Sequence, residues 1–349
     1  MKKTGTPGDW APFRVLVPNR VDLAGGTLDI YPLYLLFEGA MTVNAAISVR
    51  SVVEARPFRR GAARLHSRNY GMAVLAPGTH AIPTEGKLGL LSRALRHYPA
   101  VSGVELVVRN EAPVGSGIGA SSALLVALMA AMGRLTGTAK PWMETAMAAM
   151  EIEASHLKSL TGRQDHIAAL RGGVQGIRFL PGSLEVNRLP PGGKAGRMLH
   201  AHGFLAHTGI AHRSSDVNWR MIRGAIEGDS AVLRKFRGIA AAARDAWDAV
   251  SAADAGALGA AVRSEWRIRR TLAEGVSPRK VEDLLADRRF RRLVSGAKLC
   301  GAGNGGMLFG LLRDPADRPE AEAILSDAGM SVVPFRISGG VRIEACDGA

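Results

Sequence analysis

The sequence contains very little cysteine: among its 349 residues only Cys300 and Cys346 are present. Two cysteines imply no disulfide framework, and this usage fits a reducing compartment. Long hydrophobic runs are also missing, so no stretch is typical of a membrane span. The opening residues, MKKTGTPGDW, lack the apolar core of a secretory signal. We therefore expect a cytoplasmic protein without a membrane partner.

Aromatic residues are scarce at 5%, and acidic residues are outnumbered, with 31 Asp and Glu against 45 Lys and Arg. The formal net charge of +14 favours anionic partners such as nucleotides and sugar phosphates. The arginines are dispersed, however, and no basic stripe is interleaved with aromatic residues as in many nucleic-acid-binding proteins. A nucleic acid is therefore not expected to be the partner.

Hydrophobic residues make up 47% of the chain, which is enough for a substantial core and suggests two domains, and the layout of predicted strands and helices indicates an α+β fold. Alternating and helical patterns predict mixed strands and helices on both sides of the segment Leu189–Gly196 (LPPGGKAG), which reads as a linker. We expect one domain over residues 1–195 and a second over 196–349. Within these domains the clearest predictions are a broken strand pair over 13–23, a strand over 104–109, helices over 121–135 and 141–160, a hairpin over 174–188, and strands near 296–300 and 307–313.

The segment Pro113–Leu125, PVGSGIGASSALL, lies between a predicted strand and an apolar helix. Its three glycines permit positive φ angles and a close approach of backbone N–H groups to a ligand. The start of the following helix offers unpaired N–H donors and a partial positive charge, which together favour phosphate. The serines that follow are placed either to cap this helix or to reach a metal bound to the phosphates.

Two familiar phosphate motifs do not fit this loop. A P-loop ends in Gly-Lys-Ser/Thr, and this segment contains no lysine. A dinucleotide fingerprint needs Gly-x-Gly-x-x-Gly and an acidic residue about twenty positions later. Here the spacing is Gly-x-Gly-x-Gly, and no acidic residue lies between the loop and Glu144. The sequence therefore predicts a phosphate loop of another kind.

Three sequence blocks follow one another along the chain: PNRVDLAGGTLD from Pro18, the glycine loop, and KLCGAGNGG from Lys298. Together they resemble the three signature motifs of the GHMP small-molecule kinases. A fourth block, TGRQDHIAALRGG from Thr161, is similar to the branch that contains heptose-phosphate and fucose kinases. The resemblance implies a two-domain fold, with an N-terminal domain like domain 2 of ribosomal protein S5 and a ferredoxin-like C-terminal domain. It also implies ATP and Mg²⁺ as cofactors.

The resemblance assigns roles to residues of this chain. It makes Asp165 the catalytic aspartate and places Arg20 beside the transferred phosphate, where it would stabilise charge. It gives Mg²⁺ to Ser122 and Glu153, with Ser121 as the substitute for the serine and Glu151 as the less favoured acid. The residues implied to hold ATP are Gly115, Ser116, Gly117, Gly119, Ala120, Ser121 and Ser122.

For the acceptor substrate, the resemblance implies contacts from Asp29 and more weakly from its neighbours. The full set of implied substrate residues is Gly26, Thr27, Asp29, Gly303, His212 and Arg213. The histidine and arginine are candidates for gripping an anionic group. Asn304 departs from the all-glycine run of the family, which puts the shape of that loop in question.

Galactokinases carry Glu-His where this chain has Gly26–Thr27, and mevalonate kinases usually lack a Gln164–Asp165 equivalent. The resemblance therefore implies phosphorylation of the anomeric hydroxyl of a sugar or sugar phosphate, with D-glycero-D-manno-heptose 7-phosphate giving the 1,7-bisphosphate. Fucose, another free sugar or a mevalonate-type acceptor are alternatives within the kinases. A non-catalytic sugar sensor and an ATP-dependent decarboxylase are the alternatives outside them. The oligomeric state, monomer or homodimer, stays open.

Overall fold

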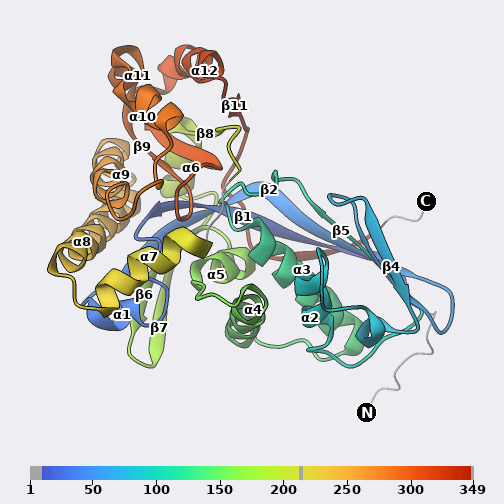
Figure 1. Cartoon of the computed structure of the whole chain (residues 1–349). Helices are drawn as coiled ribbons and strands as arrows, with labels where there is room; N and C mark the ends of the chain where they lie inside the picture. Colours follow the sequence, from blue (N-terminus) through green and yellow to red (C-terminus); the bar gives the residue numbers. More distant parts are fainter. Residues whose placement is uncertain (1–9, 212–214, 347–349) are drawn as a thin grey trace.

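The computed structural model describes residues 10–211 and 215–346, and within these ranges a larger sheet of eight strands carries the N-terminal half of the molecule (Figure 1). Its main path runs β12-β1-β2-β5-β3-β4, and the β6–β7 hairpin joins along β2. The strands are β1 (Phe13–Ala24), β2 (Met41–Pro57), β3 (Ala63–Ser67), β4 (Met72–Ala76), β5 (Val104–Asn110), β6 (Val174–Leu180), β7 (Ser183–Leu189) and β12 (Arg342–Ala345).

Strands β1 and β2 pair antiparallel along almost their whole lengths and form the spine of this sheet. The sequence predicted that Pro18 would divide β1 in two, and this was wrong. The strand continues, and its register with β2 shifts between Pro18 and Asn19 instead. Proline has no N–H to donate to a neighbouring strand. A bulge at this point lets the strand continue without that hydrogen bond. The shift precedes Arg20 and Asp22, both of which are buried.

A layer of helices covers one side of the large sheet (Figure 1). Its members are α2 (Gly89–Leu95), α3 (Ala120–Thr136), α4 (Trp142–Leu157) and α5 (Gln164–Arg171), while α1 (Leu33–Leu36) and the 3₁₀ turn η1 (Thr79–Ala81) are short. Helix α3 packs on β1 and β2, and ten of its residues are buried. Burial of this apolar helix fixes its first turn in place, and the glycine loop ends there.

A smaller sheet has the strand order β11-β8-β10-β9, with all neighbours antiparallel. In chain order this is 4-1-3-2, the ferredoxin-like arrangement that the resemblance implied. The strands are β8 (Gly203–His207), β9 (Val294–Leu299), β10 (Met307–Leu312) and β11 (Ser331–Val332). The helices of this half are α6 (Lys194–His202), α7 (Ser215–Ile226), α8 (Ser230–Ala252), α9 (Ala255–Arg269), α10 (Arg279–Ala286), α11 (Arg288–Leu293) and α12 (Arg318–Asp327), with a 3₁₀ turn η2 (Pro315–Asp317).

The two halves share a hydrophobic core. Helix α8 packs on β1 and β2, helix α9 packs on β9, and the two helices pack on each other. Leu23 of β1, Ala243 of α8 and Phe309 of β10 belong to one cluster and are fully buried. Aspartates Asp229 and Asp254 accept bonds from backbone N–H groups at the starts of α8 and α9, which explains where these helices begin. Helix α9 also packs on β1.

The chain returns to the large sheet at its end, where β12 pairs with β1 from Phe13↔Ala345 to Leu16↔Arg342. The division at residue 195 stays a prediction, but this strand of the proposed second domain lies in the first sheet. The β3–β4 hairpin was not predicted from the sequence. Its edge strand β4 is largely exposed and lacks the alternation of buried and exposed residues by which a strand is recognised. None of the helices in the described ranges is long and apolar enough to cross a membrane.

Candidate active site

A cavity of about 330 Å³ opens where the glycine loop, the end of β1 and the start of α5 meet. Residues from all four sequence motifs line it. They include Arg20, Gly26, Thr27, Asp29, Gly115, Ser116, Gly117, Gly119, Ala120, Ser121, Ser122, Glu153, Thr161, Gly162, Gln164, Asp165, Gly301 and Ala302. The structure therefore brings nearly all of the predicted site residues that it describes into one place.

The glycine loop leads directly into the N-terminus of α3. Gly119 precedes the helix with φ at +71°, and no side chain caps the helix. The first N–H groups of α3 therefore have no side-chain acceptor, which suits an anion. Ser116 Oγ is buried without a hydrogen-bond partner among the described residues. A loop with free donors beside a positive helix end fits the phosphates of ATP.

The third motif, which begins at Lys298, contacts the glycine loop from the smaller sheet. Met307 N donates to Ser116 O at 2.8 Å. A Cβ on Gly306 would lie 2.5 Å from the same carbonyl oxygen, so only glycine fits there. Asn304 adopts φ +64°, a conformation that asparagine tolerates better than most residues. Although Asn304 departs from the family's all-glycine run, the backbone at this position is therefore left-handed.

Glu153, on α4, faces the two serines of α3. Its carboxylate accepts hydrogen bonds from Ser121 Oγ at 2.9 Å and Ser122 Oγ at 2.8 Å, and His166 Nε2 lies 3.1 Å from Oε2. Burial alone would raise the pKa of Glu153, but His166 and the two serine hydroxyls outweigh it, and the net pKa is lowered. An ionised carboxylate next to a hydroxyl and the phosphate loop fits a Mg²⁺ that keeps most of its ligands from phosphates and water.

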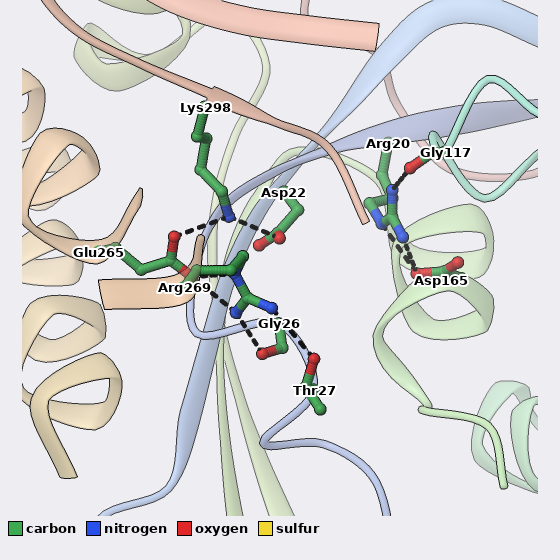
Figure 2. A network of polar contacts seen from close by, with 9 residues as sticks. All are labelled: Arg20, Asp22, Gly26, Thr27, Gly117, Asp165, Glu265, Arg269 and Lys298. Atoms are coloured by element: carbon green, nitrogen blue, oxygen red, sulfur yellow. Dashed lines mark hydrogen bonds and ion pairs between the residues drawn. The ribbon is translucent and has the colours of Figure 1, made fainter. Parts of the chain in front are cut away.

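Arg20 and Asp165 form the central ion pair of the cavity (Figure 2). Arg20 Nε donates to Asp165 Oδ1 at 2.8 Å, Nη2 lies 2.6 Å from the same oxygen, and Nη1 donates to Gly117 O at 2.7 Å. Burial opposes the charge of Arg20, but Asp165 and then Asp22 raise its pKa above the ordinary value. The arginine thus stays charged while it connects the phosphate loop with the aspartate.

Asp29 lies beside the start of α5, where its Oδ2 accepts from Gln164 N at 3.0 Å. Its side chain is almost fully buried, and burial raises its pKa although the Gln164 bond works in the other direction. A Cβ on Gly162 would come within 1.9 Å of Asp29 Oδ2, so the chain before α5 must be glycine here. Asp29 and Asp165 therefore flank one end of the cavity, from the turns that follow β1 and from α5.

Behind this end of the cavity lies a cluster of four buried charges that the sequence motifs did not identify (Figure 2). Lys298 Nζ donates to Asp22 Oδ2 at 2.7 Å and lies 3.4 Å from Glu265 Oε2, and Arg269 Nε donates to Glu265 Oε1 at 2.7 Å. All four side chains have 0% exposure. Because α9 reads as an ordinary alanine-rich helix, only tertiary structure reveals that two of its charges are buried.

The far end of the cavity was also missed by sequence reasoning. It is lined by Ser67, Asn69, Tyr70, Lys87 and Asn110 around β3 and β5. Asn69 holds the end of β5 because its Nδ2 donates to Asn110 O at 2.9 Å and its Oδ1 accepts from Asn110 N at 2.6 Å. Lys87 Nζ lies 5.7 Å from the centre of the Tyr70 ring. This end offers an aromatic face and amide groups rather than charge alone.

Three predicted substrate residues are not placed in the cavity. Gly303 does not line it but packs against Val276, whose carbonyl oxygen would lie 2.4 Å from an added Cβ. Gly301 and Ala302 of the same motif line the cavity instead. His212 and Arg213 lie outside the described residues.

Comparison with known proteins identifies the family. The family models "GHMP kinases N terminal domain" and "GHMP kinases C terminal" match residues 88–173 and 246–330. The chain belongs to the GHMP kinase superfamily. This confirms the predicted family, the predicted two-domain α+β fold and the predicted enzyme class, a kinase.

Individual relatives agree with this family. A D-glycero-alpha-D-manno-heptose 7-phosphate kinase of Campylobacter jejuni is 27% identical over 85% of this chain and 88% of its own length. A mevalonate kinase of Aeropyrum pernix is 26% identical over 92% of this chain and 97% of its own. The crystal structure of a D-glycero-D-manno-heptose 1-phosphate kinase from Bacteroides thetaiotaomicron has a TM-score of 0.76 at 21% identity, covering 96% of this chain and 100% of that one.

Proposed function

We propose that this protein transfers the γ-phosphoryl group of ATP to the anomeric hydroxyl of a sugar or sugar phosphate. The observation that carries the proposal is the Arg20–Asp165 pair, which joins the phosphate loop to the pocket bounded by Asp29 within one cavity. A phosphate donor on one side and a polar acceptor site on the other are what a small-molecule kinase needs.

The lining of the cavity supports one orientation for the nucleotide. Its phosphates would lie on the glycine loop and the uncapped start of α3, where backbone donors are available. Its base would extend toward Tyr70 and Asn69 at the far end. Mg²⁺, held by Ser122 and Glu153, would supply charge neutralisation of the phosphates.

The residues of the chain then divide the work of phosphoryl transfer. Asp165 orients the acceptor hydroxyl and receives its proton, because its carboxylate borders both parts of the cavity. Arg20 places a permanent positive charge between the loop and Asp165, where charge develops during transfer. Asp29 accepts hydrogen bonds from sugar hydroxyls. Catalysis by this arrangement consists of positioning and electrostatics, with no phosphoenzyme.

D-glycero-D-manno-heptose 7-phosphate is the acceptor that we propose first. The Campylobacter jejuni relative carries this substrate in its name and aligns along most of this chain. A phosphorylated sugar also suits the net charge of +14. Among the described residues that line the cavity, the cations are Arg20 and Lys87. The 7-phosphate would therefore need a further cation, and His212 and Arg213 stay the predicted candidates.

An ADP-release assay tests this proposal with MgATP and a panel of acceptors: the heptose 7-phosphate, sedoheptulose 7-phosphate, mannose, fucose, galactose and mevalonate. Turnover on the heptose phosphate, lowered about 10²–10⁴-fold in an Asp165→Asn variant, is expected. Turnover on mevalonate or a free sugar alone would keep the kinase and refute the proposed acceptor. ATP binding without turnover on any acceptor would contradict this acceptor class and favour a sugar sensor.

A further inference from the structure

The turn that faces the acceptor has an unusual backbone. Leu28 N donates to Gly25 O at 3.1 Å, which makes Gly25–Leu28 a β-turn with Gly26 and Thr27 as its central residues. Thr27 has φ +78°. Gly26 is not in the positive-φ region, so the positive φ at the third position defines a type II turn, which normally requires glycine or asparagine there. For a β-branched residue such a conformation is strained, and strain of this kind persists only where the surroundings enforce it.

The enforcing group is Arg269, which reaches the turn from helix α9 of the other half of the molecule. Its Nη2 donates to Gly26 O at 2.5 Å, and its Nη1 donates to Thr27 Oγ1 at 3.1 Å (Figure 2). One planar guanidinium thus donates hydrogen bonds both to the carbonyl of the Gly26–Thr27 peptide and to the side chain of Thr27. Glu265 holds the same guanidinium from behind, with Nη2 to Oε1 at 2.6 Å.

The two hydrogen bonds from Arg269 determine which way the Gly26–Thr27 peptide faces. Type I and type II turns differ by a rotation of roughly half a turn about this peptide. Because a trans peptide carries its C=O and N–H on opposite sides, fixing Gly26 O on Arg269 directs Thr27 N–H away from the buried charges. Both residues line the cavity. Gly26 itself must lack a side chain, since a Cβ would lie 2.7 Å from Asp22 Oδ2.

We propose that Arg269 is a positioning residue for the acceptor, which locks the Gly26–Thr27 peptide so that Thr27 N–H and Asp29 face the sugar together. The proposal rests on the proposed function and names how its acceptor pocket is held. It also gives a reason for two of the four charges buried behind the turn. Arg269 contacts the turn and Glu265 orients Arg269, while Lys298 and Asp22 form a second neutral ion pair beside them.

Removing Arg269 alone would leave a buried carboxylate without its main partner and threaten folding. The test therefore uses Arg269→Met together with Glu265→Gln, which removes one positive and one negative charge. The matched control makes the same two changes at the exposed pair Arg178 and Glu185 on the β6–β7 hairpin, which lie 3.1 Å apart. The thermal unfolding midpoint confirms that each variant is folded before kinetics are measured.

For the paired variant we expect the acceptor KM to rise roughly 10-fold or more, since the competent turn becomes a minor population. The KM for ATP should stay within about 2-fold, because the phosphate loop is not contacted by Arg269. In a Thr27→Gly background, where the left-handed turn is unstrained, the same pair of changes should raise the acceptor KM less than about 3-fold. The control pair should change neither constant.

An unchanged acceptor KM, an equal rise in both KM values, or the same rise in the Thr27→Gly background would overturn the proposal. A crystal structure of the Arg269→Met, Glu265→Gln protein gives a reading that needs no substrate. Thr27 should leave the positive-φ region, and a turn that keeps its φ near +78° would overturn the positioning role. Absence of turnover in the wild type, together with a relaxed turn in this structure, would instead count against the proposed function alone.

Discussion

Replacing Asp165 by asparagine is the sharpest perturbation of the candidate active site. Asparagine keeps the shape of the side chain and an oxygen that can accept from Arg20, but it cannot receive the proton of the acceptor hydroxyl. Arg20 is 4% exposed and retains the charge of Asp22 nearby, so it is not left without a counter-charge. Folding should therefore survive, whereas the chemical step should not.

The magnitude follows from the role of the lost group. A positioned general base contributes about 10²–10⁴-fold, which corresponds to roughly 3–5 kcal/mol of barrier. For folding, breaking a buried pair costs about 3–5 kcal/mol, but Asp165 is 22% exposed and the hydrogen bonds are partly kept. The loss of stability should therefore be well below that range. The expected result is a large loss in kcat with small changes in stability and ATP affinity.

The assay measures kcat and both KM values by coupled ADP release, and ATP binding by calorimetry. The control is Asp245→Asn on α8, an acidic residue of the same type away from the cavity. Turnover of Asp165→Asn within about 10-fold of the wild type would refute the assignment of Asp165. Loss of ATP binding in parallel with kcat would instead assign Asp165 to the nucleotide.

Three other changes test the remaining site. Glu153→Gln should raise the Mg²⁺ concentration needed for half-maximal rate at least about 10-fold, and an unchanged Mg²⁺ titration would remove Glu153 from the metal site. Burial raises the pKa of Asp29. Ionised Asp29 therefore destabilises the folded protein at pH values above the ordinary pKa of an aspartate. Asp29→Asn should therefore raise the melting temperature at pH 7, lose that gain as the pH falls toward about 4, and raise the acceptor KM; equal stability at both pH values would contradict this. Asn304→Gly should leave stability nearly unchanged, whereas Asn304→Val should lower it by about 1–2 kcal/mol in urea unfolding, and equal values for the two would show that the φ of +64° is not enforced.

The parts of the site that the sequence predicted are those held by local motifs. The glycine loop before α3 and the aspartate at the start of α5 depend on neighbours in the chain, so their residue types reveal them. Glu153 was favoured over Glu151 because the two lie on different sides of a helix, and Glu153 indeed faces Ser122 while Glu151 is exposed. Most strands of the two sheets could be predicted, although their order could not.

The missed parts depend on contacts between distant segments. Arg269 and Glu265 lie on a helix of ordinary composition, and only the packing of α9 against β9 buries them beside the turn that ends β1. The same holds for Asn69, whose role depends on the pairing of β3 with β5. Gly303 was misplaced since a glycine-rich motif gives no indication of which glycine faces the ligand.

Phosphorus NMR of the product formed from MgATP and D-glycero-D-manno-heptose 7-phosphate tests the central claim most directly. The proposed chemistry predicts a second phosphate resonance that couples to the anomeric proton, together with one ADP for each sugar converted. A new phosphate on another carbon, or no new phosphate while ATP binds, would contradict the proposed reaction.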